Sequence, residues 1–312
     1  MKNRQHDYIS SRQSPYLLPY KRRYKESLYS HMFLEDFSRC FSSEFSPIGE
    51  RGGFYNITPE NNTLKELLLF SDYLYFDYSF DELLSEVVYY LLINGKTYIE
   101  IVSFTNQESI VKGIEFVCVP AKCCGIRLGK YNFVGQNRKN EVINFDIDMK
   151  RLVIFDLKDI GFHRNFFRKM INHLSIFDTI NAFEFMHDPK MKGVFDFEVY
   201  QKHMEYKLLK DTKSIHWLGR NYSNQHLSES YHLYRFIQYK ALRYRFLQYI
   251  LDQINVGLDK LKSDWDFVGN ISAPVSLLRY EEAFKRYSKG EINASTLGDI
   301  VIKNLITEGI KK

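Results

Sequence analysis

Histidines and aspartates are the side chains here best suited to acid–base or metal chemistry. His216, His226 and His232 lie in one stretch of the chain, but separations of ten and six residues place them on no shared helical face. This spacing is typical of surface or partly packed histidines, and a set of metal ligands is the alternative interpretation.

Four aspartates surround one predicted strand: Asp146, Asp148, Asp156 and Asp159. Asp146 and Asp148 are two residues apart, so on a strand they share a face and could hold a divalent cation. No third carboxylate or lysine follows at a recognisable spacing, so solubility of a strand edge is the simpler interpretation. Hydrolase, zinc and nucleotide motifs are also missing from the sequence, which predicts no catalytic residue and no enzyme activity.

The cysteines are Cys40, Cys118, Cys123 and Cys124. Cys123 and Cys124 are adjacent, and no second cysteine or histidine pair lies at ligand spacing, so we expect structural thiols, no metal site and no cofactor. The start of the chain has no apolar signal segment, and charges interrupt every apolar run before the ~20 residues of a membrane span. We therefore expect a reduced, cytosolic setting and a protein that is not secreted.

Basic residues alternate with tyrosines in one long predicted helix. Arg235, Lys240, Arg243 and Arg245 are interspersed with tyrosines at 234, 239, 244 and 249. Such a pattern can follow a nucleic-acid backbone while its aromatic rings stack on bases. The alternative is a packed helix whose long side chains bury their stems and keep their polar tips in water.

The first 25 residues form a second basic segment. They contain seven lysines and arginines against a single acid, Asp7, and Lys21, Arg22 and Arg23 are consecutive. Since the whole chain has a net charge of +5, the remainder is almost neutral. We expect either a solvated arm or an arm that contacts phosphates or an acidic partner.

Apolar spacing and breaker residues predict the elements of the first half of the chain. A short helix is expected at 27–45, and a helix start at Thr58 or Thr63. The clearest unit begins at Ser79, where a helix with one apolar face is stopped by Asn94-Gly95. Strands are expected at 96–103, 113–120, 131–134, 141–145 and 152–157.

The second half reads as helical. Apolar residues recur every three to four positions from Asn165 to Phe183, and a second helix is expected at 196–212. A long helix is predicted from Ser228 to Lys262, with a length of roughly 50 Å at 1.5 Å per residue. Two short helices, 275–288 and 296–308, follow it, the second capped by Ser295 or Thr296.

These patterns predict an α+β fold: a small, mostly antiparallel sheet with N-terminal helices, followed by a helical C-terminal half that contains one long helix. With 45% hydrophobic and 26% charged residues, the chain has the composition of a folded protein, and its 312 residues allow one or two domains. We expect a basic N-terminal arm at 1–26, an α+β domain at 27–160 and a helical domain at 161–312.

The unit SFDELLSEVVYYLLINGKTYIEIV (79–102) with GIEFVCVPAK (113–122) resembles a segment of tailed-bacteriophage portal proteins, in which a helix ends at a glycine and two strands lead to a proline. Three later segments follow in an order similar to that of the family: RLVIFDLKDIGF (151–162), YRFIQYKALRYRFLQYILDQINVGL (234–258) and YEEAFKRYSKGEINASTLGDIVIKNL (280–305). The family has a Gly-Ser-Pro turn where this chain reads His163-Arg164-Asn165.

The resemblance implies a structural or assembly protein of a phage or prophage that forms a ring and is associated with DNA passage and packaging. It also implies a location in a virion or a host cytoplasm. Its expected partners are other copies of itself, double-stranded DNA and other capsid or tail proteins, and the 27–160 segment would be a wing-like domain. Two alternatives remain open: a nucleic-acid-binding or protein-interaction module that uses the basic arm and the Tyr/Arg helix, and an enzyme of an unrecognised family.

Overall fold

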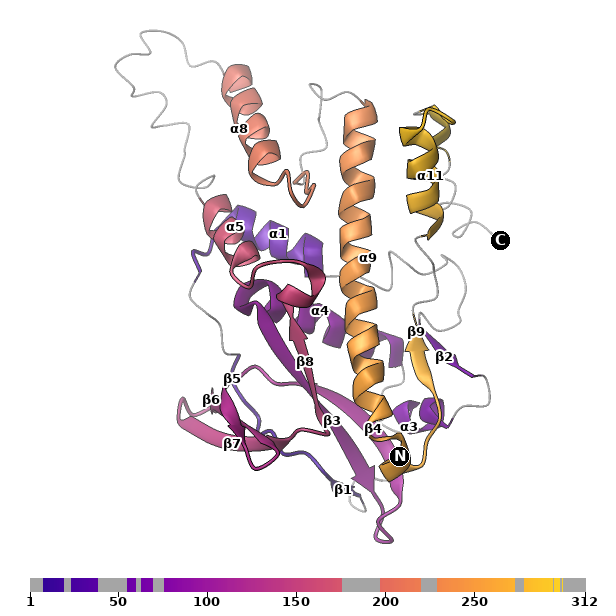
Figure 1. Cartoon of the computed structure of the whole chain (residues 1–312). Coiled ribbons are helices and arrows are strands. Elements are labelled where there is room, and N and C mark those ends of the chain that lie inside the picture. Colours follow the sequence, from indigo (N-terminus) through magenta and orange to yellow (C-terminus); the bar gives the residue numbers. More distant parts are fainter. Residues whose placement is uncertain are drawn as a thin grey trace, which may run out of the picture. The chain divides into compact units, whose positions relative to one another are not determined.

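The protein is an α+β fold of helices and antiparallel sheets, as the sequence predicts (Figure 1). The computed structural model describes residues 8–19, 24–38, 55–59, 63–69, 76–175, 197–219, 229–272, 278–293, 295–297 and 299. In that part of the chain, none of the helices combines the length and the apolar character needed to cross a bilayer.

The chain divides into two compact units that are each built from separate stretches of sequence. Unit 1 comprises 1–22, 38–164 and 246–275, and unit 2 comprises 23–37, 165–245 and 276–312. The boundary falls inside helix α9 (Glu229–Asp259), so its first part belongs to unit 2 and its last part to unit 1. The contiguous domains expected at 27–160 and 161–312 stay a prediction; in the present division, 1–22 and 246–275 join unit 1 and 23–37 joins unit 2.

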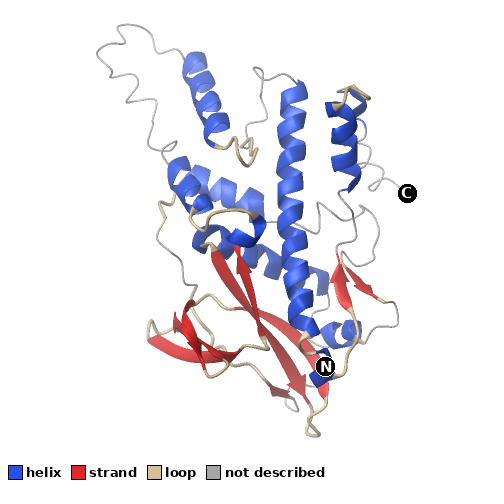
Figure 2. Ribbon diagram, in the orientation of Figure 1, coloured by secondary structure: helices blue, strands red, loops and turns tan. Residues whose placement is uncertain are grey.

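Unit 1 is organised around one central strand, β3 (Lys96–Thr105). On one side β3 pairs with β4 (Val111–Cys118), and on the other with β8 (Leu152–Asp156) and the short β1 (Ile9–Ser10), all antiparallel. A second, three-stranded sheet has the order β5 (Lys122–Arg127), β6 (Lys130–Gln136), β7 (Val142–Asp148) (Figure 2). A third, two-stranded sheet pairs β2 (Asn56–Thr58) with β9 (Asn270–Ser272).

Both faces of β3 are covered, which explains why seven consecutive residues of this strand are buried. One face meets helices: Phe116, the β4 partner of Ile101, contacts Phe80 of α4 (Phe76–Asn94), and Ile101 lies against Gly257 of α9. On the opposite face Tyr98 packs with Phe133 of β6 in a core shared by the two sheets. Helix α4 itself buries one continuous stripe of fully covered residues: Leu84, Val87, Val88, Leu91 and Leu92.

Residues 8–18, which we call the N-terminal segment, are part of unit 1. Its backbone N–H groups at Gln13 and Ser14 donate to the buried carboxylate of Glu100, at 2.6 and 2.9 Å. Leu17 packs in the core beside Gly135, where a Cβ atom would come within 2.9 Å of the leucine side chain. The prediction of a solvated arm over 1–26 is therefore corrected for these residues, because their backbone groups find partners on β3 and β6.

Unit 2 is helical, and aromatic residues form much of its core. It contains α1 (Leu28–Ser38), α5 (Phe166–Leu174), α8 (Phe197–Asp211), the first part of α9 and α11 (Leu278–Ser288). Phe33 and Phe37 of α1 pack against Phe167 of α5 and Trp217, and all four side chains are buried. The Trp217 indole donates to the Asp36 carboxylate at 3.0 Å, which satisfies its polar edge.

Most predicted elements are present, with shifted ends. Helix α4 begins three residues before Ser79, and the helix that follows Thr63 is α3 (Leu64–Leu69). The long helix ends at Asp259, and a short turn of helix, α10 (Lys262–Trp265), follows it. Thr296 donates its backbone N–H to the side chain of Asn293, so Asn293 occupies the cap position expected at Ser295 or Thr296. Residues 39–45, 176–183 and 300–308 of the predicted helices lie outside the described part of the chain.

Candidate functional site

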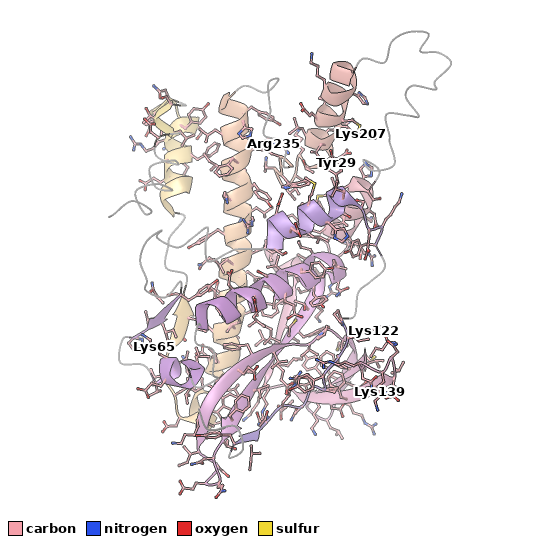
Figure 3. All side chains as sticks on the ribbon, turned by 180° about the vertical axis from the view of Figure 1, so that it is seen from behind. Tyr29, Lys65, Lys122, Lys139, Lys207 and Arg235 are labelled. Atoms are coloured by element: carbon pink, nitrogen blue, oxygen red, sulfur yellow. The ribbon has the colours of Figure 1, made fainter. Side chains whose placement is uncertain are left out.

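Two arginines of helix α9, Arg235 and Arg243, form the most unusual polar feature of unit 2. Their side chains are 0% and 1% exposed, although arginine is one of the residues least often buried. They are eight residues apart, so they lie about two turns apart on the same side of the helix. Figure 3 shows Arg235 on this helix.

Arg235 binds the C-terminal end of helix α8. Its guanidinium donates to the carbonyl oxygens of Leu209, Thr212 and Trp217, at 2.9, 3.2 and 2.8 Å, and to the Thr212 hydroxyl at 2.9 Å. The Leu209 carbonyl lies in the last turn of α8, where carbonyl oxygens lack partners within the helix and carry the negative end of its dipole. The guanidinium supplies both hydrogen-bond donors and positive charge there, and it also binds carbonyls of the segment 212–217 that follows the helix. Among the described residues, the Arg235 Nε has no hydrogen-bond acceptor.

Arg243 makes the same kind of contact with a different helix. Its Nε donates to the carbonyl oxygen of Phe37 at 3.1 Å, in the last turn of α1, and its guanidinium lies 5.9 Å from the centre of the Tyr239 ring. Arg235 and Arg243 thus dock α8 and α1 on the same helix. Both guanidinium groups hold helices together by donating hydrogen bonds to backbone carbonyl oxygens.

These contacts correct the interpretation of Arg235 and Arg243 as nucleic-acid-binding residues, because buried guanidinium groups that donate to carbonyls present no surface to a phosphate. Of the other α9 candidates, Arg245 is exposed, and Lys240 is half-buried with its amine 5.4 Å from the centre of the Phe236 ring. Lys21, Arg22 and Arg23 lie outside the described residues. The seven predicted binding residues therefore do not form one site in the described part of the chain.

Unit 1 contains a polar network in which two of the four candidate aspartates, Asp156 and Asp159, meet Arg164 and Tyr249. At the end of β8, the Asp156 carboxylate accepts two hydrogen bonds from Arg164 Nε at 2.9 Å and also pairs with Arg164 Nη2. Burial raises the pKa of Asp156, but the hydrogen bonds from Arg164 and from the Lys158 N–H outweigh it, so this pKa lies below its usual value.

Tyr249 connects this network to α9. Its hydroxyl accepts from the Asp156 N–H at 2.9 Å and donates to the Asp159 carboxylate at 2.8 Å. Burial raises the pKa of Tyr249, so the phenol stays protonated and can act as this donor. The network fixes the end of β8 against the helix.

The remaining candidates are dispersed. Asp146 and Asp148 lie on β7 and accept hydrogen bonds from Asn132 and from the Lys150 N–H, while Asp156 and Asp159 belong to the network described above. Among the described residues, no three histidine, cysteine or acidic side chains come together in a group that could hold a metal ion.

The candidate histidines and cysteines are also dispersed in the described part of the chain. His216 packs edge-on against Tyr234, and burial together with the charge of Arg235 lowers its pKa, whereas His226 lies outside the described residues. Cys118 is buried, which raises the pKa of its thiol, and Cys124 is exposed on β5.

Comparisons of the sequence with protein-family models and with curated proteins found no match.

Proposed function

We propose that the chain is a portal-like structural subunit of a phage or prophage particle, which assembles into a ring and is associated with DNA passage. The observation that carries this proposal is the order of the elements. Helix α4 ends at Gly95, β3 and β4 follow and end before Pro120, and β8, the long helix α9 and the helix α11 that stops before Gly290 come later. This order supports the resemblance drawn from the sequence.

The polar chemistry of the described residues favours a structural role. Among the described residues, the side chains of Arg235 and Asp156 each make several hydrogen bonds that hold elements of the chain together. In a scaffold subunit such contacts fix the geometry of surfaces that bind other subunits. The proposal accordingly assigns the chain no catalytic step, no cofactor and no metal, and its partners are copies of itself, DNA and other capsid or tail proteins.

The mass of the purified protein tests this proposal. One chain has a mass of 37.2 kDa, so a closed ring of about a dozen subunits would have a mass of about 450 kDa. Light scattering of the protein as it elutes from a size-exclusion column should give this mass over a tenfold range of loading concentration, because a closed ring has no free interface left. A monomer at every concentration would contradict ring assembly.

A second candidate function is binding of nucleic acid without ring assembly. It is favoured by exposed cationic groups on unit 1, including Arg138 next to the exposed ring of Tyr16. A monomer that binds nucleic acid would favour this function over the first.

A further inference from the structure

Tyr16 is a large aromatic side chain that the N-terminal segment leaves outside the core. It is 69% exposed, whereas its neighbour Leu17 packs inside. The Arg12 guanidinium lies 4.1 Å from the centre of the Tyr16 ring, and that of Arg138 lies 5.9 Å from it. Both distances are within the range of cation–π attraction. Two cations therefore gather around a ring that still has most of its surface in water.

The backbone holds this cluster in place. Leu17 forms a β-bridge with Asn137, and the Leu18 N–H donates to the Gln136 carbonyl at 2.7 Å, which fixes Tyr16 beside the turn between β6 and β7. In that turn the Asn137 side chain accepts from the N–H groups of Lys139 and Glu141, both at 2.9 Å. The turn is thus pre-organised, and it carries Arg138 and Lys139 exposed at its tip. Figure 3 labels Lys139 beside the three-stranded sheet of β5, β6 and β7.

The charge of this surface is positive. Arg12, Arg138 and Lys139 are opposed by one neighbouring acid in the turn, Glu141, whose carboxylate already accepts from the Asn137 amide at 2.7 Å. Arg12 is positioned by donating its Nε to the Ser14 carbonyl at 2.8 Å. We call the set Arg12, Tyr16, Arg138 and Lys139 the Tyr16 patch.

We propose that the Tyr16 patch binds single-stranded nucleic acid. Unpaired bases stack on exposed aromatic rings, and arginine and lysine side chains beside the ring bind the flanking phosphates. A duplex offers the phosphates but keeps its bases stacked inside, so it uses the cations without the ring. The inference does not rest on ring assembly, because all four residues belong to unit 1 of one chain.

The test is fluorescence anisotropy of a labelled 15-nucleotide thymidine strand with the full-length protein. Stacking on an aromatic side chain contributes enough that Tyr16→Ala should weaken binding about tenfold. Tyr16→Phe keeps the ring and should bind like the wild type. Unchanged binding by Tyr16→Ala would overturn the proposal.

Salt dependence separates a phosphate contact from a merely structural effect. For a single strand, each phosphate contact removed should reduce the slope of log K against log salt by about 0.7, so Lys139→Glu and Arg138→Glu should each give a shallower slope. Lys130→Glu is the matched control, since Lys130 is an exposed lysine at the opposite end of β6. Equal losses in Lys130→Glu and Lys139→Glu would show that only the overall charge matters and would contradict a site at the Tyr16 patch.

Two competitors complete the test. A duplex of the same length should compete less well than the single strand, and tighter binding of the duplex would overturn the single-strand assignment. Vesicles with one third phosphatidylserine should not displace the strand. Binding to such vesicles with no binding to the strand would also overturn it. Each measurement is made at the oligomeric state in which the protein elutes, so its outcome is independent of whether a ring forms.

Discussion

Replacing Arg235 by alanine should destabilise unit 2, because this buried side chain supplies the donors for the end of α8. The substitution removes hydrogen bonds to three carbonyl oxygens and one hydroxyl. Some of these acceptors keep another donor: the Trp217 carbonyl also accepts from the Thr212 hydroxyl, and the Thr212 carbonyl from the Ile215 N–H. The Leu209 carbonyl is the acceptor that depends most on Arg235.

The expected loss in free energy of unfolding follows from these lost hydrogen bonds. A buried acceptor left without its donor costs about 1–3 kcal/mol, and the weakened bonds at the other two carbonyls add to this loss. Removal of a buried cation recovers part of its desolvation cost. We therefore expect Arg235→Ala to lower the free energy of unfolding by about 2–4 kcal/mol.

Tryptophan fluorescence can report on unit 2 alone. The chain has two tryptophans, and replacing Trp265 of unit 1 by phenylalanine leaves Trp217, whose carbonyl is one of the Arg235 acceptors, as the single reporter. Urea unfolding followed by Trp217 emission measures the change in this background. Arg245→Ala is the matched control, because Arg245 is an exposed arginine of the same helix and its removal should change stability by no more than about 0.5 kcal/mol. Equal stability of the two variants would refute the assignment of Arg235 as the cation that docks α8.

Three further predictions concern unit 1. Val88→Asp should destabilise it by several kcal/mol because the new carboxylate is buried without a partner, and a wild-type urea midpoint would contradict the packing of α4. Because the folded pKa of Asp156 is depressed, its contribution to stability is complete above the unfolded pKa of about 4 and is lost as the pH falls through the folded value. The wild type should therefore lose stability below about pH 4, and Asp156→Asn should lose less over the same range, as measured by thermal melts from pH 2 to 7. Parallel pH profiles of the melting temperature for the two proteins would count against this role of Asp156. Alanine favours a helix over glycine by about 1 kcal/mol, yet Gly257→Ala should destabilise unit 1. The reason is that the alanine Cβ would lie 2.5 Å from Val153 Cγ2. Combined with Val153→Ala, which makes room, the loss should be smaller than the sum of the two single losses, and simple additivity would argue against the close approach.

Sequence patterns predicted the elements whose defining residues lie close together in the chain. The helix that ends at Gly95 could be identified because its apolar face is continuous and because Gly95 adopts a φ of +74°, which other residues rarely adopt. A Cβ atom there would also lie 2.2 Å from the Arg164 carbonyl oxygen. The strands β3 and β4 were recognisable from their β-forming residues and the turn between them.

Contacts between distant segments could not be predicted in this way. Strand β1 has two residues, and it is a strand only because Ile9 and Ser10 pair with β3 almost a hundred residues later. Glu100 looks like a solvent-facing residue within its strand, yet it is buried because the N-terminal segment brings two N–H donors to it. Strand β5 was missed because Cys124 and Gly125 interrupt its pattern at a bulge.

The candidate site shows the same limit. The spacing of Arg235, Arg243 and Arg245 gives their positions around the helix but not which side other helices cover. Arg235 and Arg243 are buried and Arg245 is exposed, and the difference depends on the ends of α1 and α8. Tyr16 and Arg138 come together from segments more than a hundred residues apart, so no local motif contained them.

Electron microscopy of the purified protein tests the proposed function most directly. The proposal predicts negatively stained particles with one rotational symmetry, about a dozen subunits and a central opening, in agreement with the mass in solution. The opening of a ring associated with DNA passage must also be wide enough to admit a duplex. A field of particles the size of a single chain, or open filaments of variable length, would contradict the proposal that this chain is a ring-forming, portal-like subunit.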